Sequence, residues 1–289
     1  MNSVVCKGAL ATALMPLLMI PAVVSAGEFT IEVGGFYAKT DSSFNARSRV
    51  DELQEQIDLQ LDFEKDLKLE EEELLPYFKL NYAFNDRHYV YFDYKRLHRS
   101  ATSQGSIEPF EFDYDGDTYI VDGSAELTSS MNVDISRIGY GYKFFNGERL
   151  DLGISLGLHV MYFEVGFEGQ IEVCDQGDNS LGCAQSDPDN SVFSDVTAPL
   201  PDIGLSADFD LTEHWTINTH AQYFHIKIDN IEGEMIDLHA GLKYQFVEDW
   251  HLNFGWRYYD VTVDDNRDNG GLDVGYQFQG PMLILGATF

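Results

Sequence analysis

The chain has 289 residues, with 49 Asp and Glu against 18 Lys and Arg, so its formal net charge is −31. This balance argues against a nucleic-acid partner, because neutralising phosphates requires clustered basic side chains. With 44% hydrophobic and 13% aromatic residues, the chain is also too apolar to be a disordered acidic one.

The first 26 residues have the pattern of a cleaved signal peptide. Lys7 supplies a positive charge, residues 9–24 form an apolar stretch with two prolines, and small residues precede a cleavage site after Ala26. The alternative is an N-terminal membrane anchor, which the prolines and the small-residue exit disfavour. We therefore expect residues 1–26 to be removed and residues 27–289 to form a single domain of an exported protein.

Alternation of apolar and polar residues dominates the rest of the chain and predicts β-strands with one apolar face. The clearest stretches are 150–162, 238–246 and 250–258. A soluble sandwich or lipocalin-like barrel would point this face inward. The length of the stripes, the small and charged residues between them and the aromatic residues at strand ends favour an apolar face toward lipid.

Four very short connections set the predicted topology. They lie at 85–87, 146–148, 212–214 and 247–249 and join the strand pairs 74–84/88–100, 132–145/149–165, 199–211/214–228 and 235–246/250–263. A first strand near 28–40 and a last near 273–289 bring the count to ten. The fold class is therefore predicted as all-β, a transmembrane antiparallel up-and-down β-barrel with short periplasmic turns and long extracellular loops.

Three segments inside the long loops also alternate. They are 57–63, 110–112 and 119–121. They form either extramembrane hairpin extensions or two further strands, which would make twelve, and we expect ten.

Cys174 and Cys183 lie close together in a polar loop. In an exported protein such a pair predicts a disulfide. A zinc site is the competing interpretation, but two cysteines without a nearby histidine do not complete one.

Charged and histidine side chains occur on the strand faces that would point into the barrel. We expect them to line the lumen as an ion-pair and hydrogen-bond network, because charges inside a membrane persist only when paired or hydrated. A histidine cluster that binds a metal or carries protons is the alternative; we predict no metal and no cofactor. The predicted lumen-lining residues are Lys79, Asp93, Lys95, Arg137, Lys143, Asp151, His159, Asp202, Asp208, His220, Asp237, His239, Lys243 and Arg257.

Two short motifs resemble parts of known functional sites. His98-x-Ser100 resembles an element of outer-membrane lipid A deacylases, but it falls on the outward parity of its strand and the surrounding motif of that family is absent. Asp113-x-Asp115 imitates a calcium loop without the glycine and glutamate that such a loop needs. We expect no catalysis and, at the acidic runs 70–73, 113–117 and 264–268, only weak binding of divalent cations.

The last residues, Phe289 preceded by apolar residues at alternate positions, resemble the terminal signature of bacterial outer-membrane barrels. The resemblance implies location in the cell outer membrane, contact with its lipid and lipopolysaccharide, and recognition of Phe289 by the barrel-assembly machinery. More loosely, Gly35-Phe36-Tyr37 and Gly280-Pro281 resemble the small OmpW-like barrels.

The expected function is that of a non-enzymatic outer-membrane protein, either a structural barrel or a narrow pore for small solutes. Two alternatives remain open: an enzyme acting on envelope lipid, and a barrel that binds an external partner through its acidic loops.

Overall fold

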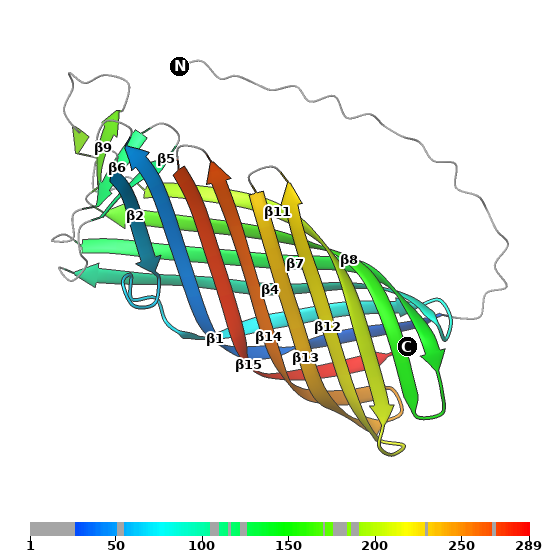
Figure 1. The fold of residues 1–289 in the computed structure, drawn as a ribbon. Coiled ribbons are helices and arrows are strands. Elements are labelled where there is room, and N and C mark those ends of the chain that lie inside the picture. The colour runs from blue at the N-terminus through cyan, green and yellow to red at the C-terminus, as the bar shows by residue number, and fades with distance from the viewer. Residues whose placement is uncertain are drawn as a thin grey trace.

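The computed structural model describes residues 27–50, 55–104, 110–114, 117–121, 126–169, 171–175, 184–185, 191–228, 231–267 and 270–289. Ten antiparallel strands form a closed up-and-down barrel, which confirms the predicted fold class (Figure 1). They are β1 (Glu28–Val50), β3 (Glu72–Ala83), β4 (His88–Gln104), β7 (Glu126–Asn146), β8 (Leu150–Gly169), β11 (Ser191–Asp210), β12 (Trp215–Ile228), β13 (Ile231–Val247), β14 (Trp250–Arg267) and β15 (Gly270–Thr288). β15 pairs back with β1, and this seam closes the barrel.

The additional strands lie outside the ring of ten barrel strands. β2 (Glu55–Asp62) pairs with the far part of β1. β5 (Phe110–Tyr114), β6 (Asp117–Val121), β9 (Ile171–Asp175) and β10 (Ala184–Gln185) form a separate four-stranded sheet. Ten is therefore the strand number of the barrel, and the alternating loop segments are extensions.

Some predictions fall on parts that the structure does not describe. Residues 1–26 and Cys183 lie outside the described residues, as does the side chain of Cys174. The signal peptide and the disulfide therefore stay predictions. Among the described residues, no helix is long and apolar enough to cross a membrane.

The apolar face of each barrel strand changes sides along its length. On β7, Ile138 and Tyr140 point outward and are 58% and 43% exposed, whereas Met131, Val133 and Ile135 point inward and are buried. The outward apolar band runs from the short turns to this change of side, as expected of a barrel surface in contact with hydrocarbon. Beyond the change, most side chains of the outer face are polar and most of the interior is apolar, with Arg99, Thr40 and Ser42 among the buried polar exceptions.

This change corrects the expectation of a polar inward face along whole strands. A strand that leaves the hydrocarbon meets water on its outer face, so its apolar side chains are stable only inside. The strands β14 and β15 repeat the pattern of β7. In β14, Trp256 is exposed on the outside and Tyr259 is buried inside; in β15, the corresponding residues are Leu283 and Phe278.

One pair of neighbouring strands separates at a proline. β3 and β4 pair only as far as Tyr77 and Lys95, and the next residue of β3 is Pro76. The amide of Phe84 donates to the carbonyl of His88 at 2.8 Å, so even-numbered residues of β3 direct their amides to β4 in this unbroken register. Pro76 has no amide hydrogen, and the hydrogen-bond ladder ends there.

The same cause separates β11 from β12. Their pairing ends at Ile203 and Tyr223. The amide of Leu211 donates to the first residue of β12 at 2.8 Å, so odd-numbered residues of β11 face β12. The next two such residues are Pro201 and Pro199, and neither has a hydrogen to donate.

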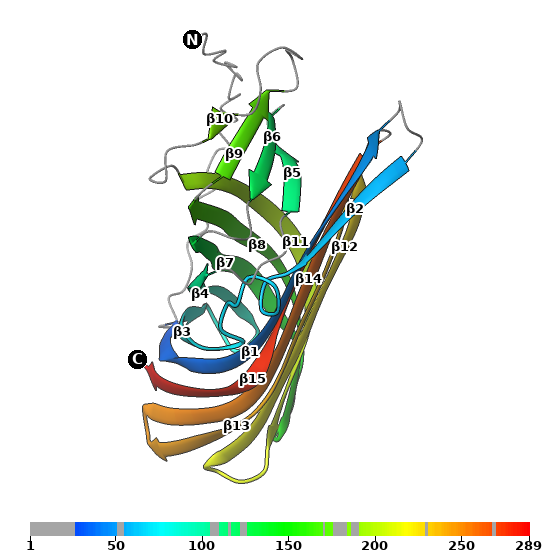
Figure 2. The same cartoon turned by 90° about the vertical axis from the view of Figure 1, so that its left-hand side faces the viewer.

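Beyond these separations the barrel continues as two walls (Figure 2). The four-stranded wall consists of the outer parts of β4, β7, β8 and β11, and the six-stranded wall consists of those of β12, β13, β14, β15, β1 together with β2. Residues 63–71, which we call the strap, connect β2 to β3 and turn in between the walls. The strap side chains Phe63, Leu67 and Leu69 are at most 3% exposed.

Replacing Pro199 and Pro201 together by Thr supplies the two missing donors opposite β12. We expect the ladder to extend past Tyr223. The backbone amides of His225 and Lys227 should then exchange with solvent about 10-fold more slowly. Hydrogen exchange followed by mass spectrometry measures this. Unchanged exchange at both amides would show that packing between the walls, and not the prolines, keeps the strands apart.

Candidate functional site in the lumen

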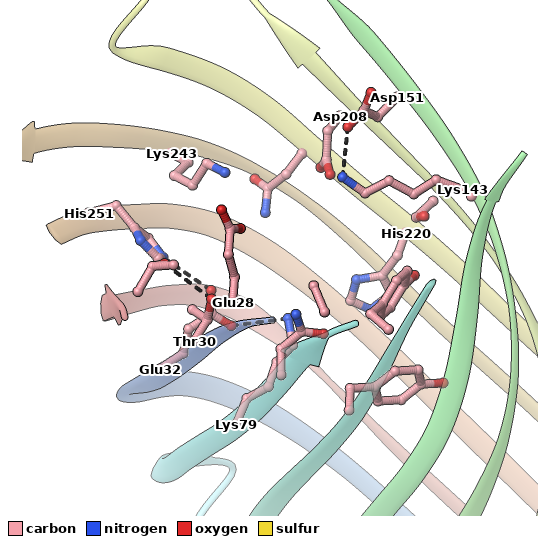
Figure 3. A pocket seen from close by; sticks show the side chains of 18 of the residues that line it. Glu28, Thr30, Glu32, Lys79, Lys143, Asp151, Asp208, His220, Lys243 and His251 are labelled. Atoms are coloured by element: carbon pink, nitrogen blue, oxygen red, sulfur yellow. Dashed lines mark hydrogen bonds and ion pairs between the residues drawn. The ribbon is translucent and has the colours of Figure 1, made fainter. Parts of the chain in front are cut away.

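The end of the barrel with the short turns encloses a cavity of about 1020 Å³, which we call the vestibule (Figure 3). Its charged side chains are partly paired. Lys79 Nζ lies 3.0 Å from Glu32 Oε2, and Lys143 Nζ lies 2.8 Å from Asp151 Oδ2. His251 Nε2 lies 3.2 Å from the other oxygen of Glu32. Such a mixed lining suits water and small polar solutes.

Two further charged side chains, Asp208 on β11 and Lys243 on β13, also point into the vestibule (Figure 3). The other predicted lumen residues that line the vestibule are Lys79, Arg137, Lys143, Asp151 and His220.

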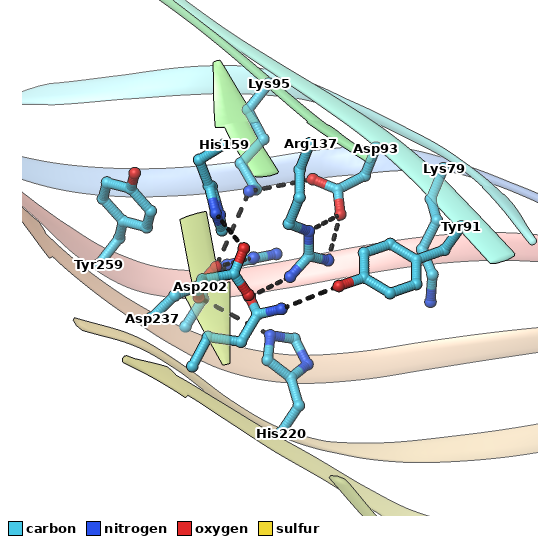
Figure 4. A network of polar contacts seen from close by, with 12 residues as sticks. Lys79, Tyr91, Asp93, Lys95, Arg137, His159, Asp202, His220, Asp237 and Tyr259 are labelled. Atoms are coloured by element: carbon cyan, nitrogen blue, oxygen red, sulfur yellow. Dashed lines mark hydrogen bonds and ion pairs between the residues drawn. The ribbon is translucent and has the colours of Figure 1, made fainter. Parts of the chain in front are cut away.

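A layer of buried charges lies next to the vestibule, and its member Arg137 also lines that cavity (Figure 4). This charged layer consists of Asp93, Lys95, Arg137, Asp237 and Arg257. Arg137 Nε donates to Asp93 Oδ2 at 2.5 Å, and Arg257 Nε donates to Asp237 Oδ1 at 2.8 Å. Lys95 Nζ lies 3.2 Å from Asp93 and 4.0 Å from Asp237. Both carboxylates are fully buried, so these ion pairs offset the cost of removing the two negative charges from water.

The charged layer also connects strands across the lumen. Lys95 on β4 reaches Asp237 on β13, and Arg137 on β7 donates to the amide oxygen of Gln222 on β12. Gln222 in turn donates to the hydroxyl of Tyr91 at 3.4 Å. The strands that diverge into separate walls are therefore held together just below the point of divergence.

The predicted lumen histidines lie beside this layer. His159 Nδ1 is 2.9 Å from Asp202, and His220 Nε2 is 3.7 Å from Asp237. His220 stacks on His239 with ring centroids 5.1 Å apart. Stacked rings do not direct their nitrogens to one point, and no described group of three or more His, Cys, Asp or Glu has the arrangement of a metal site.

The strap is fixed by one arginine that the sequence reasoning missed. Arg99 Nη1 donates to Glu64 at 2.5 Å, to Thr40 Oγ1 at 2.7 Å and to the carbonyl of Glu70 at 3.0 Å. Arg99 Nη2 donates to Ser42 Oγ at 2.6 Å. Because Arg99 belongs to β4, Thr40 and Ser42 to β1, and Glu64 to the strap, this one side chain ties both walls and the strap together.

The docked strap is also strained. Lys68 has a φ of 62° and is the one non-glycine residue with positive φ in the part of the chain that the structure describes. This left-handed conformation costs roughly 1–2 kcal/mol for a residue with a side chain. It persists because the surrounding contacts, including the hydrogen bond from Leu69 N to Phe63 O at 3.1 Å, hold the turn in place.

The His98-x-Ser100 motif lies on the outer surface. Both ring nitrogens of His98 are in use: Nε2 lies 2.9 Å from Asp134 and Nδ1 lies 2.8 Å from Arg96. No nitrogen is left to accept the proton of the Ser100 hydroxyl, so the arrangement lacks the base that a serine nucleophile needs.

Replacing Asp237 by Asn leaves Arg257 and Lys95 buried without their shared counter-charge. We expect the free energy of unfolding to fall by about 3–5 kcal/mol, measured by urea unfolding followed by tryptophan fluorescence. Adding Arg257→Met to this variant should restore part of the loss, since the unpaired charge is removed. Glu232→Gln, in the exposed pair with Lys227, is the matched control and should leave stability nearly unchanged; an equal loss there would contradict the assignment.

No family model matches the chain, and no curated protein matches it. Among solved structures, the outer membrane protease OmpT from Escherichia coli is 9% identical, with a TM-score of 0.56 over 91% of this chain and 97% of that chain. OprG from Pseudomonas aeruginosa is 11% identical, with a TM-score of 0.35 over 91% and 96%. Ail of Yersinia pestis, in complex with the heparin analogue sucrose octasulfate, is 12% identical, with a TM-score of 0.33 over 91% and 99%.

At these identities a likeness concerns the fold alone, and the looser resemblance to OmpW-like barrels is not confirmed. The chain has the fold of the bacterial outer-membrane β-barrels.

Proposed function

We propose that this protein is an integral, non-enzymatic barrel of the outer membrane that keeps its own lumen closed. The observation that carries the proposal is the strap, whose three apolar side chains are buried between the walls. The outward band of exposed apolar side chains, with Tyr82, Phe84, Trp215 and Trp250 near the short turns, supports the membrane location.

Two barriers lie in series along the lumen. The first is the strap with the apolar side chains around it, which offers no partner to a hydrated ion. The second is the charged layer, whose Asp93 and Asp237 are fully buried. The vestibule is thus a chamber open at one end, and the geometry supports a closed structural barrel better than an open pore.

The enzyme alternative has less support. The outward histidine motif has no free base. The similar solved structure that is described as a protease shares only 9% of its sequence with this chain. The lipid A deacylase interpretation is therefore not part of the proposal.

The proposed partners are outer-membrane lipid with lipopolysaccharide, and the barrel-assembly machinery. Phe289 is 70% exposed beside the short turns, which leaves it accessible for recognition. Divalent cations remain candidates at the acidic loops, although Glu71 lies 3.1 Å from Lys39 and Glu72 accepts a hydrogen bond from Tyr37. The other acidic runs, apart from Asp264, and most of the loop with the two cysteines lie outside the described side chains, so an external partner stays a prediction.

Planar-bilayer recordings test the closed lumen. We expect no stable current steps from the wild type. The variant Phe63→Ser, Leu67→Ser, Leu69→Ser should give small steps, because it hydrates the first barrier, while the charged layer that stays in place reduces the current without abolishing it.

Lys65→Ser is the matched control, since the Lys65 side chain belongs to the strap but is 78% exposed; it should stay silent. Heat-modifiable migration in gels verifies that each variant is folded. Regular conductance by the wild type would overturn the proposed closure.

A further inference from the structure

The space that the strap fills is lined by apolar side chains from both walls. Leu97 and Met131 come from the four-stranded wall, and Phe36, Met235 and Phe278 come from the six-stranded wall; all belong to one buried cluster with the strap side chains. Methionines adapt their shape to what packs against them. The strap contributes about fifteen side-chain carbons to this space, close to the hydrocarbon content of a hexadecanoate chain.

Arg99 places a buried positive charge beside the strap. The Arg99 side chain is 1% exposed, and the carboxylate it binds, that of Glu64, is 5% exposed. The Nε of Arg99 is buried and has no hydrogen-bond partner among the residues that the structure describes. A guanidinium with an unused donor, held beside a hydrocarbon-filled space, suits a carboxylate that accepts two hydrogen bonds.

The strap is thus a peptide that presents the carboxylate of Glu64 to Arg99 together with apolar side chains. Its docking carries the left-handed backbone of Lys68, and strained segments of this kind occur at switches and ligand clamps. Among the described residues, the walls beside it are not paired with each other beyond Lys95 and Ile203, so the middle of the strap can leave without breaking a ladder between them. The two ends of the strap stay attached to β1, through the hydrogen bonds from Phe63 N to Ser42 O at 3.1 Å and from Thr40 N to Glu71 O at 2.7 Å.

From these observations we infer that the groove between the walls is a binding site for a long-chain monocarboxylate. The carboxylate pairs with Arg99 in place of Glu64, and the alkyl chain takes the positions of Phe63, Leu67 and Leu69. The strap then serves as an internal competitor that keeps the site filled when the ligand is absent. The inference goes beyond closure of the lumen, because it names a ligand class and the residue that selects it.

The test uses the full-length barrel in lipid nanodiscs and hexadecanoate labelled at its carboxyl carbon. Carbon NMR separates carboxylate bound to a guanidinium from carboxylate in the bilayer, and a titration gives the dissociation constant. Arg99→Met should weaken saturable binding about 10-fold or more, since it removes the charged donor. Glu64→Ala should strengthen binding about 10-fold or more, since it removes the competitor.

The opposite signs separate a binding role from a structural one. If Arg99 and Glu64 only stabilise the fold, both variants lose binding together, and that result overturns the inference. Arg96→Met is the matched control, because Arg96 lies on the same strand but points outward; it should bind like the wild type. Equal binding of methyl hexadecanoate would also overturn the inference, because the ester cannot pair with Arg99 as an anion.

Limited trypsin digestion gives an independent readout. Displacement of the strap should raise cleavage after Lys65 and Lys68 when hexadecanoate is added, and Glu64→Ala should raise it without ligand. Cleavage that does not change with saturating ligand would overturn displacement. Bilayer conductance is a separate measurement: a conducting wild type refutes the closed lumen but does not alter the expected signs for Arg99 and Glu64.

Discussion

A closed barrel is stable in hydrocarbon only if every backbone amide finds an acceptor on a neighbouring strand. Pro76, Pro199 and Pro201 cannot meet this requirement, and they occur where the outward apolar band ends. There, water can satisfy the carbonyls that the prolines leave without donors. The prolines therefore divide each molecule into a barrel within the apolar band and two walls beyond it. The widened space between the walls has to be filled, and the strap and the inward apolar side chains fill it.

The polar interactions of the interior follow the same division. Inside the band, where the interior is polar, the carboxylates Asp93 and Asp237 are each shared by two cations, and these pairs link strands across the lumen at the base of the walls. Beyond the band, where the interior is apolar, a single arginine performs this role. Arg99 has no cationic neighbour in its described contacts and joins β4, β1 and the strap through hydrogen bonds to Thr40, Ser42 and Glu64. Within the band, several ion pairs thus connect strands across the lumen, whereas beyond the band the single side chain of Arg99 makes this connection.

Alternation and turn spacing were enough to predict the ten strands, the short turns and the inward position of residues such as Asp93 and Arg257, because strand parity is a local property. The sequence of β7 already shows that the apolar residues change sides, since Ile135 and Ile138 have opposite parity. Which of the two faces meets lipid at each level depends on where the hydrocarbon ends, and the sequence does not give that position. Pro76 and Pro201 could have been read as ladder ends from their parity. The strap has no periodicity, and its burial depends on the width of the space between walls. Arg99 shares the parity of Asp93 and Lys95, yet its partners are fixed only by tertiary structure.

The two walls also differ in how the chain builds them. The four-stranded wall comes from the contiguous segment between β4 and β11, so neighbouring hairpins can assemble it one after another. The six-stranded wall combines the first strands with the last four, and its seam pairs residues as far apart as Thr30 and Thr288. The strap is synthesised early, but Met235 and Phe278 in its surrounding cluster arrive last. A chain that has not closed its seam therefore displays Phe63, Leu67 and Leu69 on its surface, whereas a completed barrel hides them, so burial of the strap distinguishes finished molecules from unfinished ones.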